Sequence, residues 1–251
     1  MSGLVDLDEI VRLWAKDMYE RTRGKDLPKL QDVGLTVNWS HVKFISGKPD
    51  YAERSKIPRQ NGTVLFRSTY LNKTDAPQEH SFRTERTTCS SYTTCVSKGY
   101  TKGVNLELKL ALPDELVSAT TSFGREVTVE STDEETKEET LTWGVDSTIR
   151  VRPKYKATAE VVVEEEEFTA SFVMRVRIRG RISVAFTNPK DNNALVKLVE
   201  NDISAVMKYA QEDGKKGFVI QGKNVLWDVE GKCSFRYGIE QNVQLHETPL
   251  E

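Results

Sequence analysis

The sequence predicts a mainly β protein with a few helices, and three observations support this fold class. Apolar and polar residues alternate along most of the chain, which is the period of a β-strand. Two long stretches rich in serine and threonine, residues 80–103 and 126–153, flank one amphipathic hairpin at residues 103–124. Apolar residues recur at helical spacing only in residues 6–21 and 191–211.

Composition limits the classes of function. The chain has 251 residues, of which 37% are hydrophobic and 29% are charged, and this suits one elongated domain or two small ones with a proper core. The formal net charge is −2, so no basic surface dominates and we expect no nucleic-acid partner.

Targeting signals and cysteines bear on where the protein acts. No window approaches 18 consecutive apolar residues, and the start MSGLVDLDEIVRLW has acids where a signal peptide has bases. We expect a soluble protein that is secreted or released from the cytoplasm, or a mature form whose signal has been removed. Cys89 and Cys95 lie too far apart in one straight strand to pair, so we expect free thiols, Cys233 included.

The N-terminal region combines one helix with short strands. Residues 6–21 are predicted to be an amphipathic helix, followed by an irregular region through residue 62 with strands at 33–38 and 41–45. The apolar face of the helix consists of Leu7, Ile10, Val11, Trp14 and Met18.

The rest of the chain is predicted to be strands and one more helix. Residues 63–72 form a strand before the first hydroxyl-rich stretch, residues 157–187 form two strands, and residues 217–245 form two or three. Residues 191–211 are predicted to be a helix that ends at Gly214. Its apolar face consists of Leu195, Leu198, Val199, Ile203, Val206 and Ala210.

The hairpin GVNLELKLALPDELVSATTSFG separates its side chains cleanly into two faces. The apolar face consists of Val104, Leu106, Leu108, Leu110, Leu112, Val117, Ala119 and Phe123. The polar face includes Asn105, Glu107, Lys109, Ser118, Thr120 and Ser122. The turn between the limbs consists of Pro113, Asp114, Glu115 and Leu116.

Two interpretations of this hairpin are open. Alternation alone is typical of a half-buried antiparallel hairpin in a soluble protein. Each limb also has about the nine residues that a tilted transmembrane strand needs, and its alternation is that of a membrane β-barrel. One hairpin would leave unpaired backbone groups in lipid, so insertion requires several copies that close a barrel. The small, polar return limb and the hydroxyl-rich flanking strands favour this second interpretation.

Four consecutive stretches resemble the aerolysin-like β-pore-forming toxins, in the branch of clostridial epsilon toxin and the mosquitocidal toxins. LNKTDAPQEHSFRTE is similar to the family's entry into its long strands, and TTCSSYTTCVSKG to the strand before the insertion hairpin. GVNLELKLALPDELVSATTSF is similar to that hairpin, and KEETLTWGVDSTIRVRPKYKATAEVVV to the exit from it. The resemblance covers roughly residues 63–187.

The resemblance implies an elongated fold of long twisted antiparallel strands that binds a target-cell membrane through a surface receptor. It also implies assembly into a homo-oligomeric ring, commonly of about seven or eight subunits, and refolding of the hairpin into one barrel. The apolar face would then meet lipid, the polar face would line the lumen, and the turn would lead through the bilayer. Before insertion the hairpin would pack only lightly on the monomer.

The same resemblance suggests a division of the chain into three parts. Residues 1–62 would be a head region with the N-terminal helix and a candidate receptor-binding role, and residues 63–187 would be the pore-forming core. Residues 188–251 would be a helix and β segment packed on that core. A non-lytic glycan-, lipid- or protein-binding module on the same fold is the alternative function.

Two charged stretches have open interpretations. The arginines at 175, 177, 179 and 181 either bind acidic lipid headgroups or glycans, or form a solvated strand face that pairs with Glu164 and Glu166 on a neighbouring strand. The acidic run 133–139 is either a solvated loop or a pH or cation sensor.

Aromatic residues suggest a receptor patch, and catalytic motifs are missing. The candidate patch consists of Tyr19, Trp39, Phe44 and Tyr51, whereas Trp14 fits the helix core. The three histidines lack metal-ligand spacing, and no nucleophile or phosphate-loop motif is recognisable. We therefore expect no metal, no cofactor and no enzymatic activity.

Overall fold

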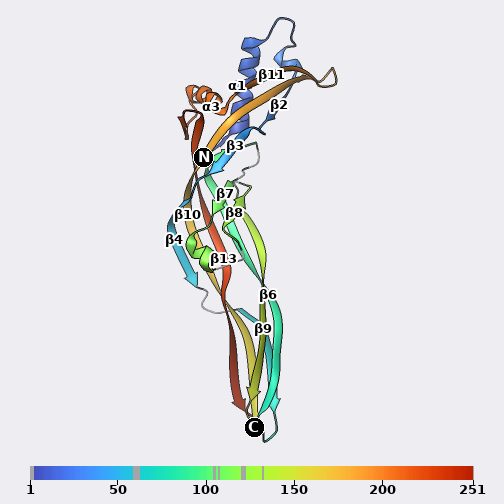
Figure 1. Cartoon of the computed structure of the whole chain (residues 1–251), viewed down its shortest axis with the longest axis vertical. Coiled ribbons are helices and arrows are strands. Elements are labelled where there is room, and N and C mark those ends of the chain that lie inside the picture. Colours follow the sequence, from blue (N-terminus) through green and yellow to red (C-terminus); the bar gives the residue numbers. More distant parts are fainter. Residues whose placement is uncertain are drawn as a thin grey trace.

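The structure, a computed structural model, describes residues 3–58, 63–103, 106, 108–119, 123–131 and 133–250. Long strands run along an elongated molecule, with helices α1 and α3 near one end and the C-terminus at the other (Figure 1). This confirms the mainly β fold class with long antiparallel strands. The strands are β1 (Gly3–Asp6), β2 (Gly34–Asn38), β3 (Val42–Ser46), β4 (Asp50–Pro58), β5 (Thr63–Asn72), β6 (Gln78–Thr101), β7 (Leu108–Ala111), β8 (Glu126–Val129), β9 (Glu135–Val151), β10 (Tyr155–Asn188), β11 (Ala194–Asp202), β12 (Phe218–Gln221) and β13 (Asn224–Pro249). The helices are α1 (Leu7–Thr22), α2 (Asp114–Ala119), α3 (Ile203–Glu212) and the 3₁₀ turn η1 (Leu30–Asp32).

Strand β10 is the spine of the sheet. It has 34 residues, several times the usual strand length, and was expected as two strands. Strand β13 pairs antiparallel with it from Tyr155 to Arg179. On its other edge β5, β4, β3 and β2 follow one another as segments of an interrupted strand. Strands β2, β3 and β4 are therefore hydrogen-bonded to the same spine as the body of the molecule, whereas β1 pairs with β6.

The half of the molecule that holds the C-terminus is a two-layer sandwich. Strand β6 pairs with β13 only between Ser91 and Lys98, and residues 78–90 of β6 pair with β9 alone. The β6–β9 ribbon therefore separates from the β5–β10–β13 layer, and apolar side chains fill the space between the layers. This smaller core consists of Phe82, Val145, Ile149, Val151, Ala157, Ala159 and Val161.

The opposite half contains the main core and the two longer helices. Helix α1 forms where predicted, and Trp14 lies in the core on its buried face. The Tyr19 ring lies 4.4 Å from that of Phe186 on β10, which ties the helix to the spine. The strands predicted at 33–38 and 41–45 are also present, as β2 and β3.

The helix predicted at 191–211 is wrong in its first half. Residues 194–202 form β11, which pairs antiparallel with β10, and helix α3 begins only at Ile203. Leu195 and Leu198, assigned to a buried helical face, are 64% and 54% exposed. The spacing of apolar residues in ALVKLVEND suits both periods, and the open edge of β10 decides in favour of the strand.

The three cysteines are free thiols with different exposure. Cys89 and Cys95 are exposed on β6, whereas Cys233 is buried and burial raises the pKa of its thiol to about 12. Because the thiolate is the reactive species, Cys233 stays protonated and slow at neutral pH. We expect a thiol reagent to label two cysteines quickly in the folded protein and the third only after unfolding. Fast labelling of all three before denaturation would contradict the burial of Cys233.

Candidate insertion segment

The segment between β6 and β9 contains a small separate sheet and a short helix. Strands β7 and β8 pair antiparallel with each other, and helix α2 lies between them in the chain (Figure 1). Leu108 pairs with Val129 and Ala111 with Glu126. The segment therefore folds back on itself and does not continue the ladder of the two long strands that carry it.

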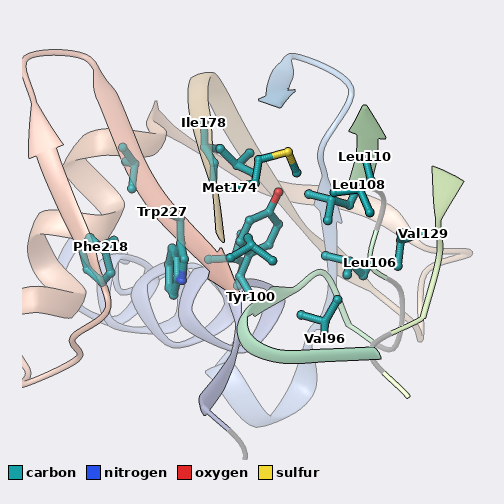
Figure 2. Close-up of a cluster of buried hydrophobic side chains, with 14 of the residues drawn as sticks. Val96, Tyr100, Leu106, Leu108, Leu110, Val129, Met174, Ile178, Phe218 and Trp227 are labelled. Carbon is teal, nitrogen blue, oxygen red and sulfur yellow. The ribbon is translucent and has the colours of Figure 1, made fainter. Parts of the chain in front are cut away.

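The leucines of this segment are part of the main hydrophobic core. Leu108 and Leu110 are 0% exposed, and they belong to one cluster with Tyr100 and Met174 of the long strands (Figure 2). The other buried side chains of the segment are Leu106, Leu112, Pro113, Leu116, Phe123, Val127 and Val129. The expectation of a hairpin packed lightly on the surface is therefore wrong.

Phe123 lies at the centre of an aromatic contact within this core. Its ring centroid is 5.7 Å from that of Tyr92 on β6 and 5.7 Å from that of Phe235 on β13. Both contacts are edge-to-face arrangements, which are favourable beyond the area they bury. Phe123 is thus packed into the same core as the leucines.

The first part of the predicted return limb is helical. Residues 114–119 are helix α2, which replaces the predicted turn and the start of the limb, while residues 120–122 lie outside the described residues. The strand that pairs with β7 is β8. The acidic pair Asp114 and Glu115 in the first turn of α2 favours a helix start, because it complements the positive end of the helix dipole. The small residues that follow have weak strand preference.

Some predicted site positions cannot be placed. Val104, Asn105, Glu107, Thr120 and Ser122 lie outside the described residues, as do the side chains of Ser118 and Ala119. In the turn, Pro113 and Leu116 are buried while Asp114 and Glu115 are exposed, and Val117 is half-buried. Lys109 is exposed, as the polar face requires.

Polar contacts hold the segment against the N-terminal strands. The Tyr51 hydroxyl on β4 donates to the Ala111 carbonyl at 2.7 Å, and burial raises the pKa of Tyr51. Arg54 pairs with Glu115 of α2 at 2.8 Å. At the start of the segment the Gly103 N–H donates to Asp6 Oδ1 at 2.9 Å. These contacts must break before the segment can leave.

The candidate aromatic patch is reduced to two residues. Tyr19 and Tyr51 are buried, the first in the core and the second against β7, so neither belongs to a surface patch in this structure. Trp39 and Phe44 are half-buried neighbours with ring centroids 6.0 Å apart. They line a hollow of about 580 Å³ together with Lys102, Lys109 and Glu126.

The arginine stripe does not pair with Glu164 and Glu166, because those glutamates lie on the same strand, β10. Arg175 instead forms two hydrogen bonds with Asp228 of β13, at 2.6 and 2.9 Å, and the guanidinium lowers the pKa of Asp228. Arg181 pairs with Glu200 of β11 at 2.8 Å. The predicted solvated strand face is present, but its partners come from two other strands.

The two ladders of this region have different registers. In the β6–β9 ladder the two residue numbers of every pair add to 229, from 78 with 151 to 94 with 135, without interruption. In the β7–β8 ladder they add to 237, as for 108 with 129. The pairing role of β8 was not recognised in the sequence, although the alternation in EVTV is its signal.

Within the ranges that the structure describes, no helix is long and apolar enough to span a bilayer. Nor do the described residues contain a group of three or more histidine, cysteine or acidic side chains arranged to hold a metal ion.

Comparison with known proteins supports the fold. No protein-family model matches the chain, and no curated protein sequence does. The chain is similar to the crystal structure of a non-toxic crystal protein from Bacillus thuringiensis, with a TM-score of 0.57 and 19% identity over 99% of this chain and 98% of that one. For the β-pore-forming protein Mpp75Aa1.1 of Brevibacillus laterosporus, the TM-score is 0.49 and the identity 13%, over 99% and 98%. For the parasporin-2 toxin of Bacillus thuringiensis, they are 0.43 and 14%, over 87% and 77%. At this level of identity the first likeness is one of fold.

Proposed function

We propose that this protein forms pores: it binds a target membrane, assembles into a homo-oligomeric ring and inserts a transmembrane β-barrel made from residues 103–124 of each subunit. One observation carries the proposal. The uninterrupted register of the β6–β9 ladder, extended through the segment, reproduces both the turn and the two faces that the sequence alternation defines.

The β6–β9 register can be continued pair by pair through residues 103–124. With pair numbers that add to 229, residue 113 meets 116, so that Asp114 and Glu115 become the loop of a tight hairpin. Directly opposite residues share a face, so Leu112 meets Val117, and Leu106 meets Phe123. The apolar positions of both limbs thus fall on one face, and residues 105, 107, 109, 118, 120 and 122 fall on the other.

The refolded hairpin has the dimensions of a membrane strand pair. Each limb has about nine residues, and a tilted transmembrane strand needs about 9–11. Its backbone groups are satisfied only in a closed barrel, which requires several subunits. Glu107 and Lys109 of every subunit would then form charged rings, the device by which pores select ions.

Moving the apolar side chains from the protein core into lipid does not expose them to water. The leucines that leave the core of the monomer enter lipid, so they are away from water before and after insertion. What must be compensated is the loss of packing and of the contacts made by Tyr51 and Arg54. Ring assembly and new ladder hydrogen bonds provide that compensation. No catalytic step is part of the proposal.

Dye release from lipid vesicles tests the proposal, with and without brief protease treatment and with a gel assay for detergent-resistant oligomers. We expect release together with a large oligomer.

The native cysteines then test the orientation of the barrel. Cys89 and Cys95 are exposed, odd-numbered residues of β6. In an uninterrupted register they would share a face with residues 105, 107 and 109, which would face water. A charged methanethiosulfonate reagent should change the single-channel conductance of the wild type and leave a Cys89→Ser, Cys95→Ser variant unchanged. Equal conductance before and after treatment would argue against this orientation.

A non-lytic binding module on the same fold is the second candidate. The complete burial of Leu108 and Leu110 favours it, because a segment that never leaves the monomer would be packed in this way. Binding to cells as a monomer, with the cells remaining sealed, would select this candidate.

A further inference from the structure

The exposed face of the sheet beside α3 carries positive charges without carboxylate partners. Arg177, Arg179 and Lys43 are exposed, and among the described residues none of them lies within ion-pair distance of an acidic side chain. Their neighbours differ in this respect, since Arg175 is held by Asp228 and Arg181 by Glu200. In the arginine stripe of β10, residues 175 and 181 are therefore neutralised by carboxylates, and residues 177 and 179 between them are not.

Strand pairing places two of the free charges directly opposite each other. Arg179 of β10 is the cross-strand partner of Lys43 of β3. Like charges in directly opposite positions of a ladder are destabilising. The position of β3 depends on Gly180, which has φ +122 and whose added Cβ would lie 2.0 Å from the His41 carbonyl oxygen. This close approach brings Lys43 to Arg179. Asp202 lines the same hollow, but it pairs with Lys223 at 3.5 Å and is not within ion-pair distance of Lys43 or Arg179.

The charges lie in ordered rows across four strands. One row runs Lys43, Arg179, Asn224 and Gln221, so all of its side chains offer hydrogen-bond donors. The next row runs Ile45, Arg177, Leu226 and Val219. Two hollows of about 390 and 480 Å³ lie along these rows, the first beside Arg179 and Lys43 and the second beside Arg177.

The apolar members of the second row identify the kind of partner. Val219 is 57% exposed, and Ile45 and Leu226 are half-buried around Arg177. A soluble anion would need the cations but not the exposed apolar side chains. A bilayer surface offers both, because phosphate groups lie above the apolar boundary. Guanidinium groups match phosphate oxygens in a two-pronged geometry.

We propose that Arg177, Arg179 and Lys43 bind the phosphate of an anionic phospholipid headgroup, so that this face of the sheet is the first contact of the protein with a membrane. The proposal rests on the membrane-binding step of the function proposed above and does not depend on insertion.

Sedimentation of the protein with vesicles tests this site. Wild type should bind phosphatidylcholine vesicles that contain phosphatidic acid, and bind pure phosphatidylcholine weakly. Each basic residue near an anionic surface contributes about fivefold in affinity, so an Arg177→Gln, Arg179→Gln variant should bind about 25-fold more weakly. Binding should also fall as salt is added.

A matched control separates a built site from diffuse attraction. An Arg175→Gln, Arg181→Gln variant removes the same charge from the same strand, but from arginines that already have acidic partners. It should keep most of the affinity. Equal losses in both variants, or equal binding of wild type to both vesicle types, would overturn the site. Stabilisation of wild type by inorganic phosphate without vesicle binding would replace the lipid by a soluble anion and overturn it as well.

A second measurement excludes simple misfolding. Because Lys43→Gln removes the repulsion from Arg179, the variant should unfold at the same temperature as wild type or higher, while it binds anionic vesicles more weakly. A lower unfolding temperature would contradict the repulsion between Lys43 and Arg179.

Failure of dye release would leave this lipid-binding site intact if vesicle binding follows the predicted pattern. Dye release from vesicles without anionic lipid would leave the pore intact and overturn the site.

Discussion

A disulfide between positions 109 and 128 is expected to abolish membrane leakage by the oxidised protein, and reduction is expected to restore it. Lys109→Cys and Thr128→Cys would join β7 to β8 in their present register. The proposed barrel would need Lys109 to pair with residue 120, so the bond would hold the segment in its present β7–β8 register. Dye release from vesicles, measured before and after reduction in a Cys89→Ser, Cys95→Ser background, checks the result.

The backbone geometry suits this bond. Leu112 N–H donates to the Arg125 carbonyl, which marks a hydrogen-bonded pair of the same register, whereas Lys109 N–H turns away to Ser46 Oγ. Lys109 and Thr128 are therefore a non-hydrogen-bonded pair, with Cα atoms about 4.5 Å apart. That distance lies within disulfide range. The exposed ion pair that Lys109 loses with Glu126 contributes little to stability.

A second disulfide serves as the matched control. Thr93 and Thr136 face each other in the β6–β9 ladder, with hydroxyl oxygens 2.8 Å apart, and their register is the same before and after the proposed refolding. The oxidised Thr93→Cys, Thr136→Cys variant should therefore still release dye. Leakage by the oxidised 109–128 protein equal to that of its reduced form would contradict the refolding.

Leu108→Ala is expected to lower the free energy of unfolding by about 2–5 kcal/mol, which is the range for leucines buried in a well-packed core. Leu108 is 0% exposed and packs with the main core, so its truncation leaves a cavity. Urea denaturation monitored by tryptophan fluorescence measures the change. A loosely packed hairpin would instead give a change near zero.

An exposed leucine provides the comparison. Leu195 on β11 is 64% exposed, and Leu195→Ala should change the free energy of unfolding by less than about 0.5 kcal/mol. A loss for Leu108→Ala as small as that of Leu195→Ala would show that the insertion segment is not a core element. The same result would also make spontaneous release of the segment easy.

The burial of this segment in the main core has a consequence for the proposed activation. A monomer in solution must give up core packing, the Tyr51 hydrogen bond and the Arg54 ion pair before β7 can move. In the proposed pore mechanism, contact with a membrane and with neighbouring subunits would have to lower this cost. Such a requirement would prevent premature exposure of the leucines in water.

Residue patterns along single elements were sufficient for much of the fold. Helix α1 and strands β2, β3 and β5 follow from periodicity, because each needs only the order of its own side chains and one buried face. The 34-residue length of β10 could not be read in this way. Its continuity comes from partners on both edges that are distant in the chain, and the same open edge turned residues 194–202 into β11.

The candidate insertion segment shows most clearly which features follow from side-chain order and which depend on the tertiary structure. Alternation in residues 103–124 predicts an apolar face, a polar face and a turn at residues 113–116, because these are properties of side-chain order. The structure instead has α2 in place of the turn and β8 as the partner of β7, and both were decided by the tertiary structure. The local preferences of Pro113–Ala119 are too weak to impose a strand, so the core that buries Leu108 and Leu110 selects the conformation.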